Sequence, residues 1–235
     1  MKALILAAGL GTRLYPITET RPKSLVPVNG KPILIKQLDN LAANGITDIT
    51  VVSGYKADVL EKAVRDSYPS VRVIESRDYA VTNNMYSAYL AREYVEGSDF
   101  LMMNADVFMD ASVITSLLAC PYENAIVTDI GRYIEESMKV TEKDGRIISI
   151  AKTIPREEAL GSSIDVYRFS PAGGKAFFNA CRRYFEEMGE LKKWSEVALA
   201  DALADEVFKA CPLSGRWFEI DDLTDLANAE ALFKD

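Results

Sequence analysis

The sequence predicts an α/β fold in which a mainly parallel sheet is covered by helices on both faces. Short apolar runs alternate with helix-like segments through roughly the first half of the chain. The first run, at residues 3–7, is apolar at every position, as expected for a strand buried on both sides. Glycine and proline residues stand where the helices should begin and end. This alternation is typical of parallel strands joined by helices.

The expected elements of this first part follow in order. After the strand at 3–7, the segment PILIKQLDNLAANG is a predicted helix, with Pro32 in its first turn and Gly45 just past its end. Then come a strand at 48–55, a helix at 57–67 closed by Pro69, a strand at 71–75, a helix at 85–94 and a strand at 99–106.

The pattern is looser after residue 120. Strands are predicted at 124–130 and 164–169, and MKVTEKDGRIISI is a predicted hairpin that turns at Asp144 and Gly145. Helices at about 173–188 and 194–209, a strand at 216–220 and a helix at about 223–233 complete the chain. Since no repeat or low-complexity tract interrupts it, we expect one domain over residues 1–235, with two halves that meet near residue 120.

Charge and composition restrict the possible partners. The formal net charge is -8, which disfavours nucleic acid and anionic membrane surfaces. Residues 1–36 nevertheless hold six basic side chains against one acidic side chain, a local balance of +5. A basic segment on an acidic protein suits a small anion better than a polyanion, because a polyanion would be repelled elsewhere on the surface.

Residue usage also predicts the compartment and excludes some chemistry. The three cysteines are far apart, so neither a zinc site nor a disulfide framework is indicated. The apolar start is too short for a signal peptide, and no run approaches the ~18 residues of a membrane span, so we expect a cytoplasmic protein. The chain has no histidine, which excludes mechanisms that need a histidine base, nucleophile or metal ligand.

Two glycines mark the end of the first predicted strand. Gly9 and Gly11 fall at the edge where open parallel sheets bind ligands, and glycine lets a backbone approach phosphate groups. The dinucleotide-binding fingerprint fails, because Leu14 stands where a third small residue is needed. A Walker loop fails as well, because Pro32 follows Gly30 and Lys31. By local rules alone, a purely structural glycine turn stays open.

The longer segment LAAGLGTRLYPITETRPKSLVPV resembles the signature of the nucleoside-diphospho-sugar pyrophosphorylase superfamily. The resemblance implies a three-layer α/β/α, Rossmann-like nucleotidyltransferase fold of the GT-A-like type, with a mixed, mainly parallel central sheet. It also implies a nucleotide-binding half at about 1–120 and an acceptor-binding half at about 121–235. In this family the loop wraps a nucleoside triphosphate, which implies that the following residues bind it: Leu6, Ala7, Ala8, Gly9, Gly11, Thr12, Arg13 and Lys23. Arg13 would clamp the phosphates, and Lys23 would contact the α-phosphate.

Two acidic segments extend the resemblance. Asp106 ends MMNAD and Asp221 lies in WFEIDDLTDL, and both match aspartates that bind magnesium in this family. Together with triphosphate oxygens they would suit magnesium, the expected cofactor. Arg13, Lys23 and Asp106 are the predicted catalytic residues. By local rules alone, Asp106 as a cap and Asp221 or Asp222 as the N-cap of the last helix stay open.

Other segments concern the choice of substrates. The stretch YAVTNNMYSAY replaces a glycine-rich motif of the sugar-specific members and resembles bacterial CTP:phosphocholine cytidylyltransferases, which implies that Tyr79, Asn83 and Asn84 lie near the nucleotide. The segment around MKV looks like cytidylyltransferases that act on small phosphates and phosphonates, and Lys139 matches a lysine expected to bind the acceptor. A loop aromatic, an asparagine N-cap and a solvent-facing lysine are the alternatives by local rules.

The sequence therefore predicts a magnesium-dependent cytidylyltransferase that moves CMP from CTP to a small phosphate or phosphonate acceptor. An ionised acceptor needs no general base, in keeping with the missing histidine. A sugar-1-phosphate uridylyl- or thymidylyltransferase and a regulatory nucleotide-binding subunit are the alternatives. Aromatic and acidic residues for a cationic acceptor are present, but no pocket is assigned from them, and no oligomeric state is predicted: Asp129, Tyr133, Asp165, Tyr167, Trp194 and Trp217.

Overall fold

The computed structural model describes residues 1–234 and orders the chain as follows. The strands are β1 Lys2–Ala7, β2 Pro27–Val28, β3 Lys31–Pro32, β4 Ile49–Ser53, β5 Arg72–Glu75, β6 Phe100–Asn104, β7 Val107–Met109, β8 Ala125–Ile130, β9 Lys139–Lys143, β10 Arg146–Ala151, β11 Gly161–Phe169, β12 Lys209–Pro212 and β13 Trp217–Glu219. The α-helices are α1 Ile33–Ala43, α2 Ala57–Ser67, α3 Asn84–Leu90, α4 Arg92–Val95, α5 Ala111–Ala119, α6 Pro171–Arg182, α7 Ser195–Asp205 and α8 Leu223–Leu232.

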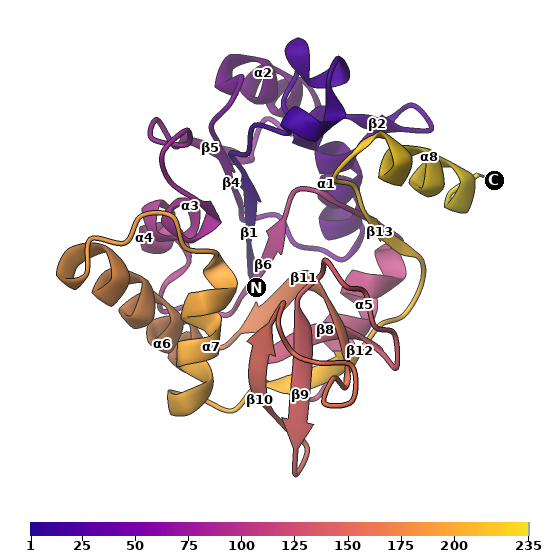
Figure 1. The fold of residues 1–235 in the computed structure, drawn as a ribbon. Coiled ribbons are helices and arrows are strands. Elements are labelled where there is room, and N and C mark those ends of the chain that lie inside the picture. Colours follow the sequence, from indigo (N-terminus) through magenta and orange to yellow (C-terminus); the bar gives the residue numbers. More distant parts are fainter. Residues whose placement is uncertain (235) are drawn as a thin grey trace.

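A mixed sheet of nine strands forms the centre of the described chain. Figure 1 shows the parallel strands β1, β4 and β6 beside one another within it. Strand β1 lies between β4 and β6 and runs parallel to both, and β5 extends the parallel part beyond β4. Strand β11 runs antiparallel to β6, β8 and β9. It therefore joins the parallel first part to the strands that follow residue 120. The predicted α/β fold with a mixed sheet that is parallel at its centre is confirmed.

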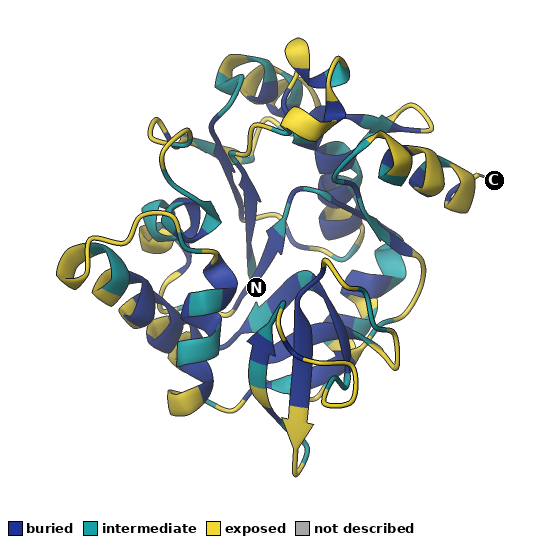
Figure 2. Ribbon diagram, in the orientation of Figure 1, coloured by how far each residue is buried: buried dark blue, intermediate teal, exposed yellow. Residues whose placement is uncertain are grey.

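The residues of β1 alternate between two hydrophobic cores. Leu4 and Leu6 face a core that contains residues of α3, α6 and α7. Ala3, Ile5 and Ala7 face the other core, against α1, α2 and α5. Because neighbouring side chains of a strand point to opposite faces, an entirely apolar strand must be covered on both sides. Figure 2 shows the central strands as buried between outer helices with exposed edges, which is the three-layer arrangement.

A third, smaller core links the chain's two ends. Leu14 and Val26 from the segment after β1 pack with Ile220, which precedes α8, and with Leu226 and Ala229 of α8. Beside it, β7 and β13 form a separate antiparallel pair, and the Ile220 amide donates to the Asp106 carbonyl at 3.0 Å. This packing brings the C-terminal segment next to the carboxyl end of β6.

Several sequence-based boundaries were wrong. The helix expected at 85–94 is divided at Ala91 into α3 and α4, and the one expected at 173–188 changes after α6 into a π-helical turn at Arg183–Glu187. The helix expected at 194–209 ends at Asp205, because Lys209 begins β12, which pairs with β8. Pro32 occupies the N-cap of α1 instead of its first turn. The short strands β2, β3 and β7 and the helix α5 had not been anticipated.

Other local predictions were confirmed. Asp144 and Gly145 join β9 to β10, and their φ angles of 54° and 68° are those that a tight hairpin turn requires. Gly45 follows α1 with a φ of 74°. Strand β11 pairs with β6, so one sheet crosses the proposed boundary near residue 120, and the assignment of functions to two halves stays a prediction. Within residues 1–234, no helix is long and apolar enough to cross a membrane.

The capping box of α8 yields a stability prediction. The Asp222 carboxylate accepts from the amides of Thr224 and Asp225 at 2.7 and 2.9 Å. We expect Asp222→Ala to lower the free energy of unfolding by ~1 kcal/mol, because both amides lose their acceptor. Asp222→Asn keeps an acceptor oxygen and should cost a few tenths at most. Urea unfolding measures both, and equal values for the two variants would contradict the capping role.

Candidate active site

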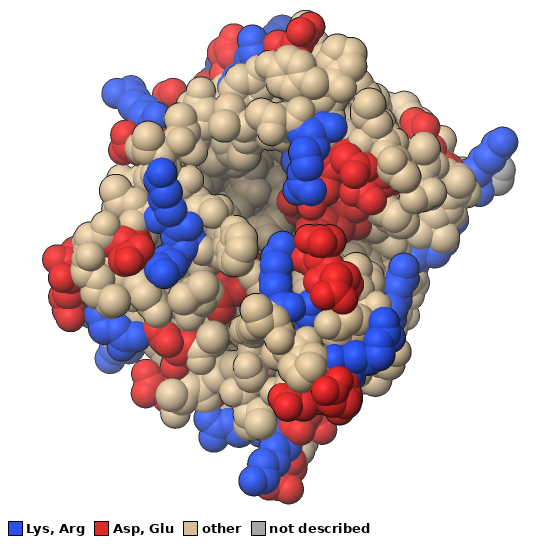
Figure 3. All heavy atoms as spheres, in the orientation of Figure 1, with Lys and Arg blue, Asp and Glu red and all other residues tan. Residues whose placement is uncertain are grey.

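A cavity of about 420 Å³ opens at the carboxyl ends of β1 and β6. Open parallel sheets bind ligands at this edge, because the loops that leave neighbouring strands converge there. Figure 3 shows the molecule hollowed on this face, with basic and acidic atoms together along one side of the hollow. The lining includes every residue predicted to bind nucleotide or metal: Leu6, Ala7, Ala8, Gly9, Gly11, Thr12, Arg13, Lys23, Tyr79, Asn83, Asn84, Asp106 and Asp221.

The glycines of the first loop have different structural reasons. Gly11 has a φ of 63°, and a Cβ atom there would lie 2.7 Å from the Cβ of Lys23. Any larger residue would therefore strain the backbone and push Lys23 away. A Cβ atom on Gly9 would meet nothing within 4 Å. The space beside Gly9 is open, so a ligand can approach the backbone of the loop closely.

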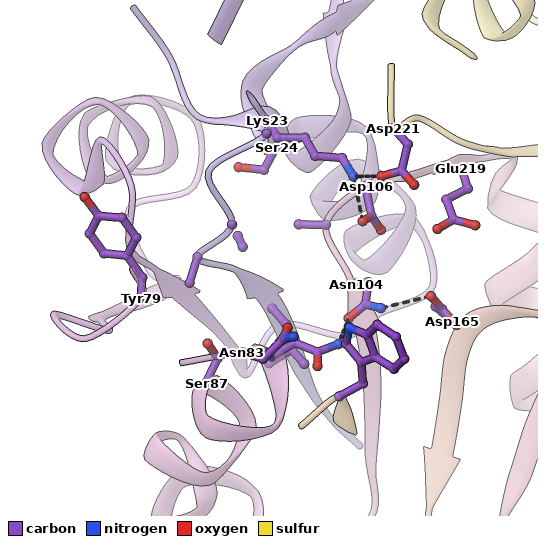
Figure 4. Close-up of a pocket in the computed structure, with 18 of the residues that line it drawn as sticks. Lys23, Ser24, Tyr79, Asn83, Ser87, Asn104, Asp106, Asp165, Glu219 and Asp221 are labelled. Carbon is purple, nitrogen blue, oxygen red and sulfur yellow. Dashed lines mark hydrogen bonds and ion pairs between the residues drawn. The ribbon is translucent and has the colours of Figure 1, made fainter. Parts of the chain in front are cut away.

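Lys23 lies between two aspartates that are distant in the sequence. Its Nζ donates to Asp106 Oδ2 at 2.9 Å and to Asp221 Oδ1 at 2.5 Å, as Figure 4 shows. The other oxygen of Asp221 pairs with Arg13 at 2.8 Å. The side chain of Lys23 is only 14% exposed, whereas that of Arg13 is 65% exposed. Lys23 is therefore fixed inside the cavity, while Arg13 stands at its rim.

These ion pairs determine the protonation of the groups involved. Burial alone would lower the pKa of Lys23, but the charges of Asp106 and Asp221 outweigh it and raise that pKa above its usual value. Burial would raise the pKa of Asp221, but Lys23 and Arg13 hold it below its usual value. Both partners stay charged across the physiological range. The sequence left open which of Asp221 and Asp222 caps the last helix. In the structure Asp222 is the N-cap of α8, and Asp221 accepts from Lys23.

A third carboxylate, Glu219, completes an acidic cluster that sequence reasoning missed. Carboxylate oxygens of Asp106, Glu219 and Asp221 lie within 4.8 Å of one another. Burial, followed by repulsion from Asp106 and Asp221, raises the pKa of Glu219 to about 7. Asp106 Oδ1 is buried with no hydrogen-bond partner. Three convergent carboxylates with an unsatisfied buried oxygen fit a hard divalent cation, which prefers oxygen ligands.

A ring of hydrogen bonds forms another part of the cavity. Asn84 donates to Asn104, which donates to Asp165 at 3.0 Å. The Tyr167 hydroxyl lies 2.9 Å from Asp165 and 3.0 Å from Glu196. The ring closes through Ser195, whose hydroxyl donates to Glu196 and whose amide donates to Asn84. Asn104, Lys152, Asp165, Trp194, Glu196 and Glu219 line the cavity and were not among the assigned site residues.

Asp165 and Glu196 are unusual carboxylic acids. Burial, together with the nearby charges of Glu196 and Glu219, raises the pKa of Asp165 well above its usual value. Burial also raises the pKa of Glu196. Asp165 has a φ of 57°, in a stretch where the pairing of β11 with β8 shifts register. The irregular strand turns an acidic side chain toward the cavity, where no regular pattern would have predicted it.

The predicted residues do not all have the expected surroundings. Asn83 is the N-cap of α3, which is the alternative that local rules left open, and its side chain also lines the cavity. Lys139 is fully buried, and its ammonium donates to the Glu135 carbonyl at 2.8 Å instead of lining the cavity. Burial lowers the pKa of Lys139. Its role in acceptor binding stays a prediction, and Lys152 is the additional lysine that does line the cavity.

Among the residues named for a cationic acceptor, Asp165 and Trp194 line the cavity. Tyr167 lies behind Asp165 in the hydrogen-bonded ring. The other three are outside the lining and occupied elsewhere: Asp129 accepts from Trp217, and Tyr133 donates to the Ile154 carbonyl. The sequence could not separate these two groups, because the distinction depends on the register of β11 and the position of α7.

The Nucleotidyl transferase family model matches residues 2–135. A choline-phosphate cytidylyltransferase from Streptococcus pneumoniae is 33% identical over 189 residues, which cover 71% of this chain and 81% of that protein. A 2-aminoethylphosphonate cytidylyltransferase from Lancefieldella rimae is 37% identical over 105 residues, which cover 45% of this chain and 42% of that protein.

The solved structures include a CTP:phosphocholine cytidylyltransferase from Streptococcus pneumoniae that matches with a TM-score of 0.83. The match covers 99% of both chains at 24% sequence identity. At this identity it is informative about the fold, and it confirms the three-layer architecture predicted from the sequence.

The buried Glu196 carboxyl predicts how stability changes with pH. Because its pKa is raised on folding, its neutral form is fully present below the unfolded-state value, and stability is lost as the pH rises toward the folded-state value. Glu196→Gln retains the oxygen that accepts from Tyr167 and Ser195 but removes the charge. We expect the melting temperature of the variant to exceed that of the parent by about 2–4 °C at pH 8, the effect of ~1 kcal/mol in a domain of this size.

At pH 4, below the unfolded-state value of 4.5, the two melting temperatures should converge, because the parent carboxyl is then largely neutral in both states. Glu187→Gln, at an exposed position, is the matched control and should change the melting temperature little at either pH. If the melting temperatures of Glu196→Gln and the parent differ by the same amount at both pH values, the inference that burial raises the pKa of Glu196 is wrong.

Proposed function

The chain belongs to the Nucleotidyl transferase family, and from that premise we propose that it is a magnesium-dependent cytidylyltransferase. It transfers CMP from CTP to a small phosphate or phosphonate acceptor that carries an ammonium group, and it releases pyrophosphate. One observation carries the proposal: a single cavity combines a glycine-rich basic loop, an acidic cluster, and two further carboxyls that have no ion-pair partner among residues 1–234. Family membership alone establishes nucleotidyl transfer, and the rest is proposed.

The loop after β1 is suited to the triphosphate. The open space beside Gly9 admits phosphates to the backbone, and the exposed Arg13 guanidinium can reach them at the rim. Tyr79 lies on the opposite side of the cavity from Asp221, as Figure 4 shows, where its ring is available to the nucleoside. CTP is favoured because the YAVTNNMYSAY segment resembles cytidylyltransferases and because the curated relatives described above are cytidylyltransferases.

The acidic cluster fits magnesium. Asp106 and Asp221, with Glu219 nearby, would hold the ion together with phosphate oxygens, and the unsatisfied Asp106 Oδ1 is available to it. When bound, the ion supplies charge neutralisation on the phosphate chain. Lys23 and Arg13 add positive charge from the protein at the same end of the cavity. Asp106, Lys23 and Arg13 therefore keep the catalytic roles predicted from the sequence.

The chemical step requires alignment more than proton transfer. An oxygen of the acceptor attacks the α-phosphorus as the bond to pyrophosphate breaks, and the attacking oxygen is ionised near neutral pH. The chain has no histidine, and the carboxyls of this cavity need not remove a proton from such an acceptor. The protein's contribution is to hold two anions in line and to stabilise the departing charge.

Charge balance supports an acceptor with an ammonium group. Lys23 and Arg13 are already paired with Asp106 and Asp221. Asp165 and Glu196 form hydrogen bonds to neutral groups, and among residues 1–234 no ion pair involves either of them. An ammonium group would stabilise the ionised form of these carboxyls and pair with it, whereas a neutral sugar would supply no such charge. Lys152, whose ammonium lies 5.1 Å from the centre of the Trp194 ring, also lines the cavity.

A matched acceptor screen tests the proposal. Pyrophosphate release is measured with CTP and phosphocholine or 2-aminoethylphosphonate. Each is compared with an analogue of the same shape that lacks the ammonium charge, 3,3-dimethylbutyl phosphate or propylphosphonate. We expect kcat/KM for at least one ammonium compound to exceed that of its analogue about tenfold or more, since one compensated buried charge is worth at least ~1.4 kcal/mol.

Other outcomes would contradict parts of the proposal. Turnover only with UTP or dTTP and a sugar 1-phosphate would establish the alternative, a sugar-1-phosphate uridylyl- or thymidylyltransferase. Triphosphate binding without turnover for any acceptor would favour a regulatory nucleotide-binding subunit. Equal rates with the ammonium compounds and with the analogues that lack the ammonium charge would contradict the proposed preference for an ammonium acceptor. Such a result would leave cytidylyl transfer intact.

Two substitutions should separate the ends of the cavity. Asp165→Asn should raise KM for the ammonium acceptor about tenfold and leave KM for CTP within twofold, because it removes one uncompensated carboxylate. Asp106→Asn should instead lower kcat by roughly 100-fold or more, the usual cost of losing one charge-stabilising group. Steady-state kinetics with both substrates varied measures the two effects. An unchanged kcat for Asp106→Asn would refute its assigned role.

A further inference from the structure

The Lys23 ammonium occupies the position that a cation bound to the acidic cluster would take. It lies 2.9 Å from Asp106 Oδ2 and 2.5 Å from Asp221 Oδ1, and it points into the same group of carboxylates that converges within 4.8 Å. Figure 4 shows the long Lys23 side chain reaching across to these two aspartates. A divalent cation that binds the same oxygens cannot do so while the ammonium remains there, because both need the same lone pairs and repel each other.

The lysine satisfies this cluster incompletely. Asp106 Oδ1 is buried and has no partner, so the ammonium uses only one of the two oxygens of Asp106. Glu219 accepts from the Ser137 hydroxyl at 3.2 Å and, within residues 1–234, has no ion-pair partner. Lys23 and Arg13 together balance Asp106 and Asp221, and Glu219 adds a third carboxyl to the cluster. Such a site attracts a second, more highly charged cation once the ammonium can leave.

Lys23 has a route by which it can leave. Its backbone is fixed in the short 3-10 turn Lys23–Leu25 beside Gly11, while the four-carbon side chain can rotate. The same cavity contains the open space next to Gly9, where phosphates of a nucleotide would lie. A triphosphate there offers the ammonium new anionic partners, and movement of the ammonium frees the two aspartates. The nucleotide and the divalent cation would then bind with positive coupling.

We propose that Lys23 is the resident cation of the Asp106, Glu219 and Asp221 cluster in the nucleotide-free protein, and that a divalent cation binds tightly there only when a triphosphate draws Lys23 away. The inference rests on the proposed function for the identity of the nucleotide, but its test does not require turnover. It assigns Lys23 a gating role at the metal site in addition to its predicted contact with the α-phosphate, and it assigns Glu219 to the site.

Calorimetric titration of the nucleotide-free protein with manganese chloride tests the proposal. We expect weak binding by the parent and at least tenfold tighter binding by Lys23→Met, which keeps the length of the side chain and removes the competing charge. Lys23→Arg retains a cation and should bind manganese as weakly as the parent. Lys152→Met removes another lysine of the same cavity that is not on the cluster and should change the affinity less than threefold.

The site itself is checked in the double variant Lys23→Met, Asp106→Asn, which should lose the gained affinity. Equal manganese affinities for Lys23→Met and the parent would overturn the proposal, as would tight binding by the nucleotide-free parent. If Lys23→Met does not fold, the Lys23 ammonium signal of the parent is followed by nuclear magnetic resonance. Magnesium alone should leave that signal unchanged and magnesium with CTP should shift it, whereas a shift with magnesium alone overturns the proposal.

The outcome is independent of the acceptor screen. Tighter manganese binding by Lys23→Met would support the gating role even if no acceptor were turned over. If the parent protein turns CTP over but Lys23→Met binds manganese no more tightly than the parent, the proposed function stays intact and only the gating role of Lys23 is removed.

Discussion

The contact of Lys23 with Asp106 and Asp221 is the constraint on which the site depends. Its partners are 83 and 198 positions away in the sequence, so three distant segments must meet within hydrogen-bond distance. A partly buried ion pair is stable only when its geometry is well defined, because each charge has lost part of its water. The small core around Leu14 and Ile220 and the pairing of β7 with β13 supply that definition. The small core contains none of the three predicted catalytic residues, and β13 ends at Glu219 of the acidic cluster, yet both elements hold Asp221 opposite Lys23.

The predicted site residues whose positions could be foreseen are those governed by local rules. Gly9, Gly11 and Asp106 directly follow strands, and the carboxyl ends of neighbouring parallel strands must meet at one edge. The hairpin at Asp144 and Gly145 follows from turn chemistry within a few residues. Glu219 was missed although a signal existed. It precedes Asp221 by two positions at the end of β13, and such neighbours share a side of an extended chain.

Other parts could not be predicted because they depend on tertiary arrangement. Asp165 enters the cavity through a register shift in β11, and Glu196 joins it through the Tyr167 hydroxyl, which is hydrogen-bonded to both carboxyls. The end of α7 was misplaced for a related reason. Phe208, Ala210 and Cys211 continue an apolar pattern that also suits a helix, and pairing with β8 makes the last two a strand. Lys139 illustrates the same limit, since its sequence neighbours do not reveal that Glu135 takes its ammonium.

The two ends of the cavity present opposite electrostatic problems, and a zwitterionic acceptor would solve both. Near Lys23 and Arg13, positive side chains need anions, and two aspartates satisfy them until phosphates arrive. Near Asp165 and Glu196, no ion pair among residues 1–234 involves either carboxyl, and burial raises the pKa of each. An acceptor with a phosphate at one end and an ammonium at the other fits in a single direction, because reversal would place like charges together. Orientation of this kind presents the phosphate oxygen to the α-phosphorus without a base, so charge placement can replace the histidine that the chain lacks.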